Sequence, residues 1–133
     1  MAYELIDHPA DVGVRVTSET IQGLFEQAAL ALADLAGASS TAGSMRTRVE
    51  VEGIDTVDLL VRWLQELLYL MEVKGLRLAS VEVTRLGDTG LSALVSGERA
   101  QDLPTGGIKA VTYHGLEIRH IGDSFEAVII FDT

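Results

Sequence analysis

The sequence of 133 residues contains no cysteine. This absence excludes disulfide bonds, a thiolate nucleophile and any zinc site built from cysteine. No apolar run is long enough to cross a bilayer, and the first residues show neither the basic segment nor the apolar core of a secretory signal. We therefore expect a cytoplasmic protein with no membrane segment. The length suits a single domain over residues 1–133, and a hydrophobic fraction of 47% is ample for a folded core.

Clusters of basic residues are also missing. The chain carries 10 Lys and Arg against 20 Asp and Glu, which gives a formal net charge of -10. Nucleic-acid binding usually depends on clustered Lys and Arg that contact phosphates. We therefore expect no tight direct binding to nucleic acid. An acidic surface suits a bound cation or a basic protein partner, and it also serves solubility alone.

The sequence has none of the common catalytic motifs: no G-x-S-x-G, no Walker A pattern and no H-E-x-x-H. His8, His114 and His120 lie far apart, without the i, i+4 spacing of a paired zinc site. The Gly106-Gly107 pair lacks the Gly-Lys-Ser/Thr ending of a phosphate-binding loop, so we interpret it as a turn. We do not expect an enzyme.

Hydrophobic periodicity predicts two helices. Apolar residues recur at helical spacing over residues 21–35, and Gly37 supplies a stop. A wider apolar stripe covers residues 59–71, after a suitable N-cap at Asp55, and Gly75 ends it.

Alternating residues predict roughly seven strands, with hairpins dominating the second half of the chain. They cover residues 3–6, 12–16, 46–52, 76–85, 91–95, 116–121 and 125–131. Residues 108–114 fit either a short helix or a strand. The combination indicates an α+β fold in which two helices pack on one face of a mostly antiparallel β-sheet.

Two acidic positions could bind a cation. Asp11 lies between the first two strands, and Asp132 follows Phe131 and faces the opposite side of the last strand. Carboxylates are ligands for hard cations such as Ca²⁺ and Mg²⁺. Apolar neighbours on its strand predict a desolvation cost for Asp132, which a metal ion would offset. If the first two strands pair with the last one, Asp11, Asp132 and the Thr133 carboxylate converge into an anionic pocket.

A simpler interpretation stays open for each of these residues. Asp11 could be a turn residue, and Asp132 could mark the place where the last strand frays into water. His8, between the same two strands, could be a hydrogen-bonded turn histidine or a ligand.

Several runs resemble the archease family. They are the opening HPADVG of residues 8–13, LFEQAA of residues 24–29, WLQELLY of residues 63–69, IKAVTYH of residues 108–114, and the aliphatic strand that ends in Asp132. Together they span nearly the whole chain in the family's order. Pro9, Gln65 and Thr133 stand where the family usually has Thr, Asn and Ile, and both aspartates are retained.

The resemblance implies a protein cofactor of the GTP- and manganese-dependent RNA ligase of the RtcB type, which joins tRNA halves in tRNA splicing and repairs RNA ends. By the same resemblance, the protein is expected to promote guanylylation and multiple turnover of this ligase. The resemblance also implies a divalent cation, Ca²⁺, Mg²⁺ or Mn²⁺, bound by Asp11, Asp132 and the Thr133 carboxylate. It suggests supporting roles near this site for His8, Lys109, Thr112 and His114.

Two other functions remain as alternatives. One is a general chaperone or modulator of RNA-processing proteins, which a small sheet with an acidic face would permit. The other is a hydrolase that uses Asp11 and Asp132 to bind an activating metal. The lack of an evident nucleophile or of a histidine placed as a base counts against the hydrolase.

Overall fold

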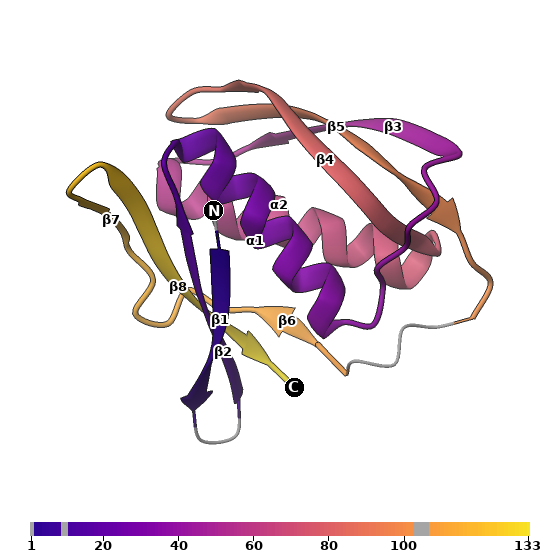
Figure 1. The fold of residues 1–133 in the computed structure, drawn as a ribbon, viewed down its shortest axis with the longest axis horizontal. Coiled ribbons are helices and arrows are strands. Elements are labelled where there is room, and N and C mark those ends of the chain that lie inside the picture. Colours follow the sequence, from indigo (N-terminus) through magenta and orange to yellow (C-terminus); the bar gives the residue numbers. More distant parts are fainter. Residues whose placement is uncertain (1, 9–10, 103–106) are drawn as a thin grey trace.

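The computed structural model describes residues 2–8, 11–102 and 107–133 (Figure 1). This part of the chain holds two helices, α1 (Ile21–Leu35) and α2 (Thr56–Val73). Its eight strands are β1 (Ala2–His8), β2 (Asp11–Ser18), β3 (Met45–Glu52), β4 (Leu76–Leu86), β5 (Gly90–Arg99), β6 (Ala110–Val111), β7 (Ile118–Ile121) and β8 (Ser124–Asp132).

The predicted elements are confirmed within a few residues of their bounds. The open segment 108–114 contains the short strand β6. Two parts of the sequence interpretation lie outside the described residues: the Pro9-Ala10 portion of the opening motif, and Gly106 of the glycine pair.

The strands form two antiparallel sheets. Sheet A has the order β1-β2-β8, and both β6 and β7 pair with the free side of β8. Sheet B has the order β3-β5-β4. The first and last strands of the chain therefore belong to the same sheet, with β8 between β2 and the two short strands.

Both helices lie between the two sheets (Figure 1). Helix α1 contacts β2 of sheet A and β4 of sheet B, and α2 contacts β6 of sheet A and β3 of sheet B. The α+β class, the two helices and the antiparallel pairing agree with the prediction, but the strands form two sheets instead of one. The reason is visible in the helices, because a helix covered from two sides needs apolar residues around most of its circumference. In α2 the buried apolar residues are Leu59, Leu60, Val61, Trp63, Leu64, Leu67, Leu68 and Met71.

The two helices are fixed to each other and capped at their ends. The indole N–H of Trp63, fully buried, donates to the carbonyl oxygen of Phe25 on α1 at 3.0 Å. The Asp55 carboxylate accepts from the N–H of Asp58 at 2.8 Å, as predicted for an N-cap.

After α2 the chain turns at Gly75, whose φ of 75° favours glycine. An added Cβ there would lie 2.1 Å from the carbonyl oxygen of Ala100.

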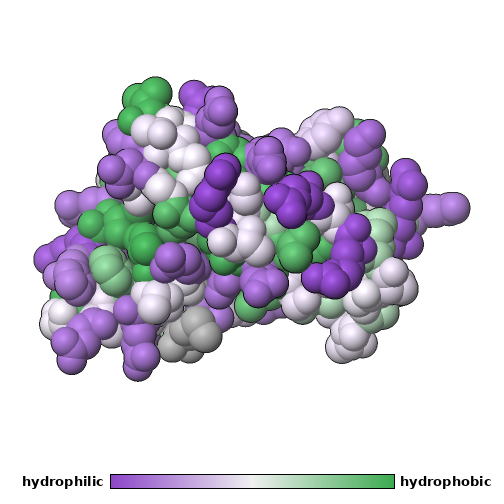
Figure 2. Space-filling view, turned by 90° about the horizontal axis from the view of Figure 1, so that it is seen from above, coloured by the Kyte–Doolittle hydropathy of each residue, from purple (hydrophilic) through white to green (hydrophobic). Residues whose placement is uncertain are grey.

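The surface over sheet B is mostly hydrophilic, and hydrophobic residues show only in separate patches (Figure 2). Within the described ranges, neither helix has the length and apolar content needed to span a membrane.

Candidate functional site

The pairing of β2 with β8 places Asp11 directly opposite Asp132. Residues directly opposite in an antiparallel pair point to the same face of the sheet, with Cβ atoms about 5 Å apart. The condition set by the sequence, that the first strands pair with the last one, is therefore met. The two residues lie side by side at one end of sheet A, on the strands β2 and β8, which lie far apart in the sequence (Figure 1). We call these two residues the aspartate pair.

The aspartate pair belongs to the face of sheet A that points away from the helices. The alternate residues of both strands, such as Val14 and Phe131, are fully buried against the core. Asp132 itself is exposed. The expectation that Asp132 is desolvated among apolar neighbours is therefore wrong. Asp132 is the last residue of its strand, and water reaches it there, while Ile130 one step earlier on the same face is buried.

The main chain of Asp132 is held from both sides. β2 lies on one side, and on the other Ala110 of β6 is its register partner. The N–H of Lys109 donates to the carbonyl oxygen of Asp132 at 2.8 Å. The N–H and the hydroxyl of Thr112 both donate to the carbonyl oxygen of Ile130 at 3.0 Å. Lys109 and Thr112 thus fix the end of β8 through the main chain.

The other predicted supporting residues lie in the same region. His8 is the register partner of Asp11 in β1, so His8, Asp11 and Asp132 follow one another across sheet A. The side chain of His8 lies outside the described part of the structure. His114 is exposed, and its N–H donates to the hydroxyl of Thr112 at 3.3 Å. Thr133 follows Asp132 directly and is exposed.

The chemistry of the aspartate pair suits a hard cation. Two like charges directly opposite each other in a sheet repel, and a divalent cation between them converts that repulsion into attraction. Within residues 2–8, 11–102 and 107–133, no group of three or more His, Cys, Asp or Glu side chains forms a metal cage. A cation here would therefore take its further ligands from main-chain oxygens and water, as Ca²⁺ and Mg²⁺ commonly do.

A second polar cluster, which sequence reasoning did not find, fixes the segment after β6. The buried carboxylate of Asp58 on α2 accepts hydrogen bonds from the Tyr113 hydroxyl, from the N–H of Ile54 at 2.9 Å and from Nε of Arg62 at 2.8 Å. The N-cap spacing and the Arg62 position, four residues on, were visible in the sequence. Tyr113 was not connected to them by any local pattern.

These contacts shift the pKa values of Asp58 and Tyr113. The hydrogen bond from Tyr113, followed by that from Ile54, holds the pKa of Asp58 below its ordinary value. The same bond raises the pKa of Tyr113, because the neutral phenol is the donor. Asp58 is thus ionised at neutral pH and ties α2 to the segment that carries Lys109, Thr112 and His114.

Comparison with known proteins identifies the family. The profile of the Archease protein family (MTH1598/TM1083) matches residues 3–133. The chain belongs to the archease family. It is 33% identical to the archease of Methanosarcina mazei, over 98% of this chain and 94% of that protein. It is 34% identical to the archease of Archaeoglobus fulgidus, over 99% of each.

Solved archease structures have the same fold. The solution structure of Methanobacterium thermoautotrophicum protein 1598 superposes with a TM-score of 0.76, at 28% identity and over 98% of both chains. An archease from Thermotoga maritima, described as a "possible chaperone", superposes with a TM-score of 0.70 over 96% of this chain and 94% of its own. At 22% identity that second likeness concerns the fold alone.

Proposed function

We propose that this archease is a protein cofactor of an RtcB-type, GTP- and manganese-dependent RNA ligase, and that it performs no catalysis of its own. It would promote guanylylation and multiple turnover of the ligase in tRNA splicing and RNA repair, in the cytoplasm. The observation that carries the proposal is the aspartate pair: Asp11 and Asp132, the two acids of the family motifs, are direct register partners.

In this proposal the aspartate pair binds a divalent cation, Ca²⁺, Mg²⁺ or Mn²⁺, together with oxygens of Thr133. Such a cation neutralises charge during nucleotide transfer when it is bound. Asp11 and Asp132 hold it at the exposed end of sheet A, where a partner can approach. Lys109 and Thr112 keep the strand end in place through the main-chain bonds described above.

Charge supports a protein partner over RNA itself. With a net charge of -10, the archease is repelled by the phosphate backbone and attracted to a basic, RNA-handling enzyme. We therefore propose that contact with RNA passes through the ligase.

The test is ligase guanylylation and multiple-turnover RNA joining, with and without the archease. We expect stimulation by the wild type and its loss in Asp132→Asn and Asp11→Asn. A matched control is Glu82→Gln, which removes a carboxylate from the outer face of sheet B and should stimulate like the wild type. Absence of stimulation at stoichiometric excess would refute the proposal. Capture of many unrelated RNA-processing proteins in a pull-down would favour a general chaperone instead.

A further inference from the structure

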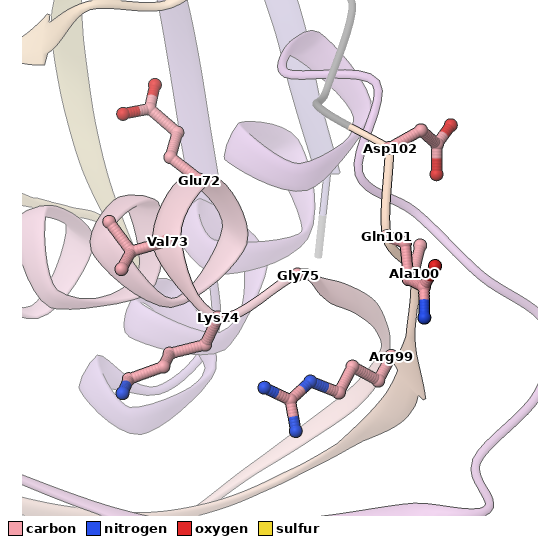
Figure 3. Close-up of a pocket in the computed structure, with 8 residues that line it drawn as sticks. All are labelled: Glu72, Val73, Lys74, Gly75, Arg99, Ala100, Gln101 and Asp102. Carbon is pink, nitrogen blue, oxygen red and sulfur yellow. The ribbon is translucent and has the colours of Figure 1, made fainter.

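A hollow lies where α2 ends, β4 begins and β5 ends, on different elements from the aspartate pair. It consists of two cavities that share the side chains of Lys74 and Arg99. The first, of about 500 Å³, has a mixed polar and apolar lining and appears in Figure 3. The second, of about 350 Å³, is largely apolar, and its lining residues are Met45, Thr47, Leu70, Lys74, Leu76 and Arg99. We call the whole feature the α2-end hollow.

Arg99 occupies a position that the sheet would normally give to an apolar residue. Along β5, the residues at alternate positions before it face the helices, and among them Ala93 and Val95 are buried. Arg99 continues this series and is the register partner of Leu76, which is buried. The sheet therefore directs a cation to the rim of an apolar cavity, just beyond the end of α2.

The two cations of the hollow have no acidic partner among the described residues. Neither Lys74 nor Arg99 forms an ion pair with a described carboxylate, whereas the nearby Asp102 carboxylate lies 3.7 Å from Arg77. Figure 3 shows the Lys74 and Arg99 side chains on the same side of the hollow, with Glu72 pointing away from both. Lys74 and Arg99 are also the only charged residues among those that line the apolar cavity in the described part of the chain.

The wall of the hollow is preformed by close main-chain contacts. The N–H of Ala100 donates to the carbonyl oxygen of Gly75 at 2.8 Å. The buried Arg77 guanidinium donates to the carbonyl oxygens of Leu76, at 3.1 Å, and of Asp102. A ligand would thus meet a surface that needs little ordering, which lowers the entropic cost of binding.

We infer that the α2-end hollow binds a peptide segment of a partner protein in which an apolar side chain is followed by carboxylates. The apolar side chain would enter the cavity lined by Leu70 and Leu76, and the carboxylates would meet Lys74 and Arg99. Charge complementarity selects this occupant, because the rest of a chain with a net charge of -10 repels acidic segments and these two cations lack acidic partners. A cavity of about 350 Å³ lies in the range of ligand pockets, ~300–1,000 Å³.

The probe is the fluorescein-labelled peptide Gly-Ser-Gly-Leu-Asp-Glu-Phe-Asp-Gly-Ser, titrated into the isotope-labelled archease and followed by NMR shifts and fluorescence anisotropy. We expect shift changes confined to the lining residues of the hollow. The double variant Lys74→Gln/Arg99→Gln should weaken binding about tenfold. Arg48→Gln, on the outer face of β3, is the matched control and should bind like the wild type. Both substituted residues of the double variant are exposed, and circular dichroism confirms that the variant folds.

Two altered peptides complete the test. Replacing Leu and Phe of the peptide by Ser, or its acids by Asn and Gln, should abolish saturable binding. The inference is overturned if the double variant binds like the wild type, if the shifts lie outside the hollow, or if the Ser peptide binds as well as the original. It is equally overturned if octanoate binds in the cavity and the peptide does not.

Discussion

Because Asp11 and Asp132 are direct cross-strand partners, Asp132→Asn should stabilise the protein without a divalent cation and destabilise it, relative to the wild type, when the cation is present. Two unit charges about 5 Å apart in water repel by about 0.8 kcal/mol. This agrees with the range of ~0.2–1 kcal/mol for cross-strand pairs. In metal-free buffer, Asp132→Asn removes the repulsion, and the variant should be more stable than the wild type by about 0.5 kcal/mol.

A divalent cation should reverse this order. A cation at ten times its Kd stabilises the folded state by about 1.4 kcal/mol, which corresponds to a rise in Tm of about 5 °C in a domain of this size. The variant lacks one of the two carboxylates and should lose most of that rise. Thermal unfolding followed by circular dichroism, in EDTA and then in Ca²⁺, Mg²⁺ or Mn²⁺ solutions, measures both effects without any ligase.

The control is again Glu82→Gln, since the residue that faces Glu82 across sheet B is Leu94 and not a carboxylate. Its Tm should respond to cations like that of the wild type. The reasoning is refuted if Asp132→Asn gains no stability in EDTA and the wild type shows no rise in Tm with any of the three cations. A control variant that behaves like Asp132→Asn would also refute it.

Three further predictions concern stability. Because the pKa of Asp58 is lowered in the folded state, its ionised carboxylate stabilises the fold fully above the ordinary aspartate pKa, and this stabilisation is lost as the pH falls through the lowered pKa. Tyr113→Phe should therefore reduce the loss of stability in acid, as measured by urea unfolding. Tyr3, whose pKa is raised to about 12 by its hydrogen bond to a carboxylate on α1, contributes stability below the ordinary value of 10.0 that is lost as the pH rises toward 12. In Tyr3→Phe, the free energy of unfolding should therefore fall less steeply with rising pH in the alkaline range, and only other titrating groups should contribute to the fall. Gly97→Ala should destabilise the fold by more than about 2 kcal/mol, because the new Cβ would lie 2.0 Å from a carbonyl oxygen of β4. Gly90→Ala is the control, because a Cβ at that position meets open space and should change stability little. The urea midpoints of the two variants measure the difference.

Local patterns predicted the parts of the fold that depend on local physics. The N-cap at Asp55 and the stops at Gly37 and Gly75 follow from backbone preferences within one turn of a helix. Alternation along the last strand correctly placed Asp132 on the face opposite Phe131. The candidate pair could be named in advance because both aspartates lie at recognisable strand ends.

Alternation shows which face a residue occupies, but not which strand lies beside it. For this reason the division into two sheets was not predictable, and neither was the meeting of Tyr113 with Asp58. The exposure of Asp132 was missed for a related reason: the apolar neighbours that suggested burial precede it in the strand, whereas water reaches the strand end. Solvent access at a strand end depends on where neighbouring strands stop, which is a property of the assembled sheet.

The position of β8 has a consequence for how the chain matures. Both helices and all of sheet B come from residues 21–99, a continuous stretch that is synthesised before β8. The β1–β2 hairpin is synthesised before these elements, yet its neighbour in sheet A, β8, is synthesised after all of them. Contacts between such distant segments form slowly, because a long loop must close first. The two aspartates therefore meet only after β8 has been synthesised and has paired with β2, and affinity for a cation would distinguish a chain with this pairing from one without it.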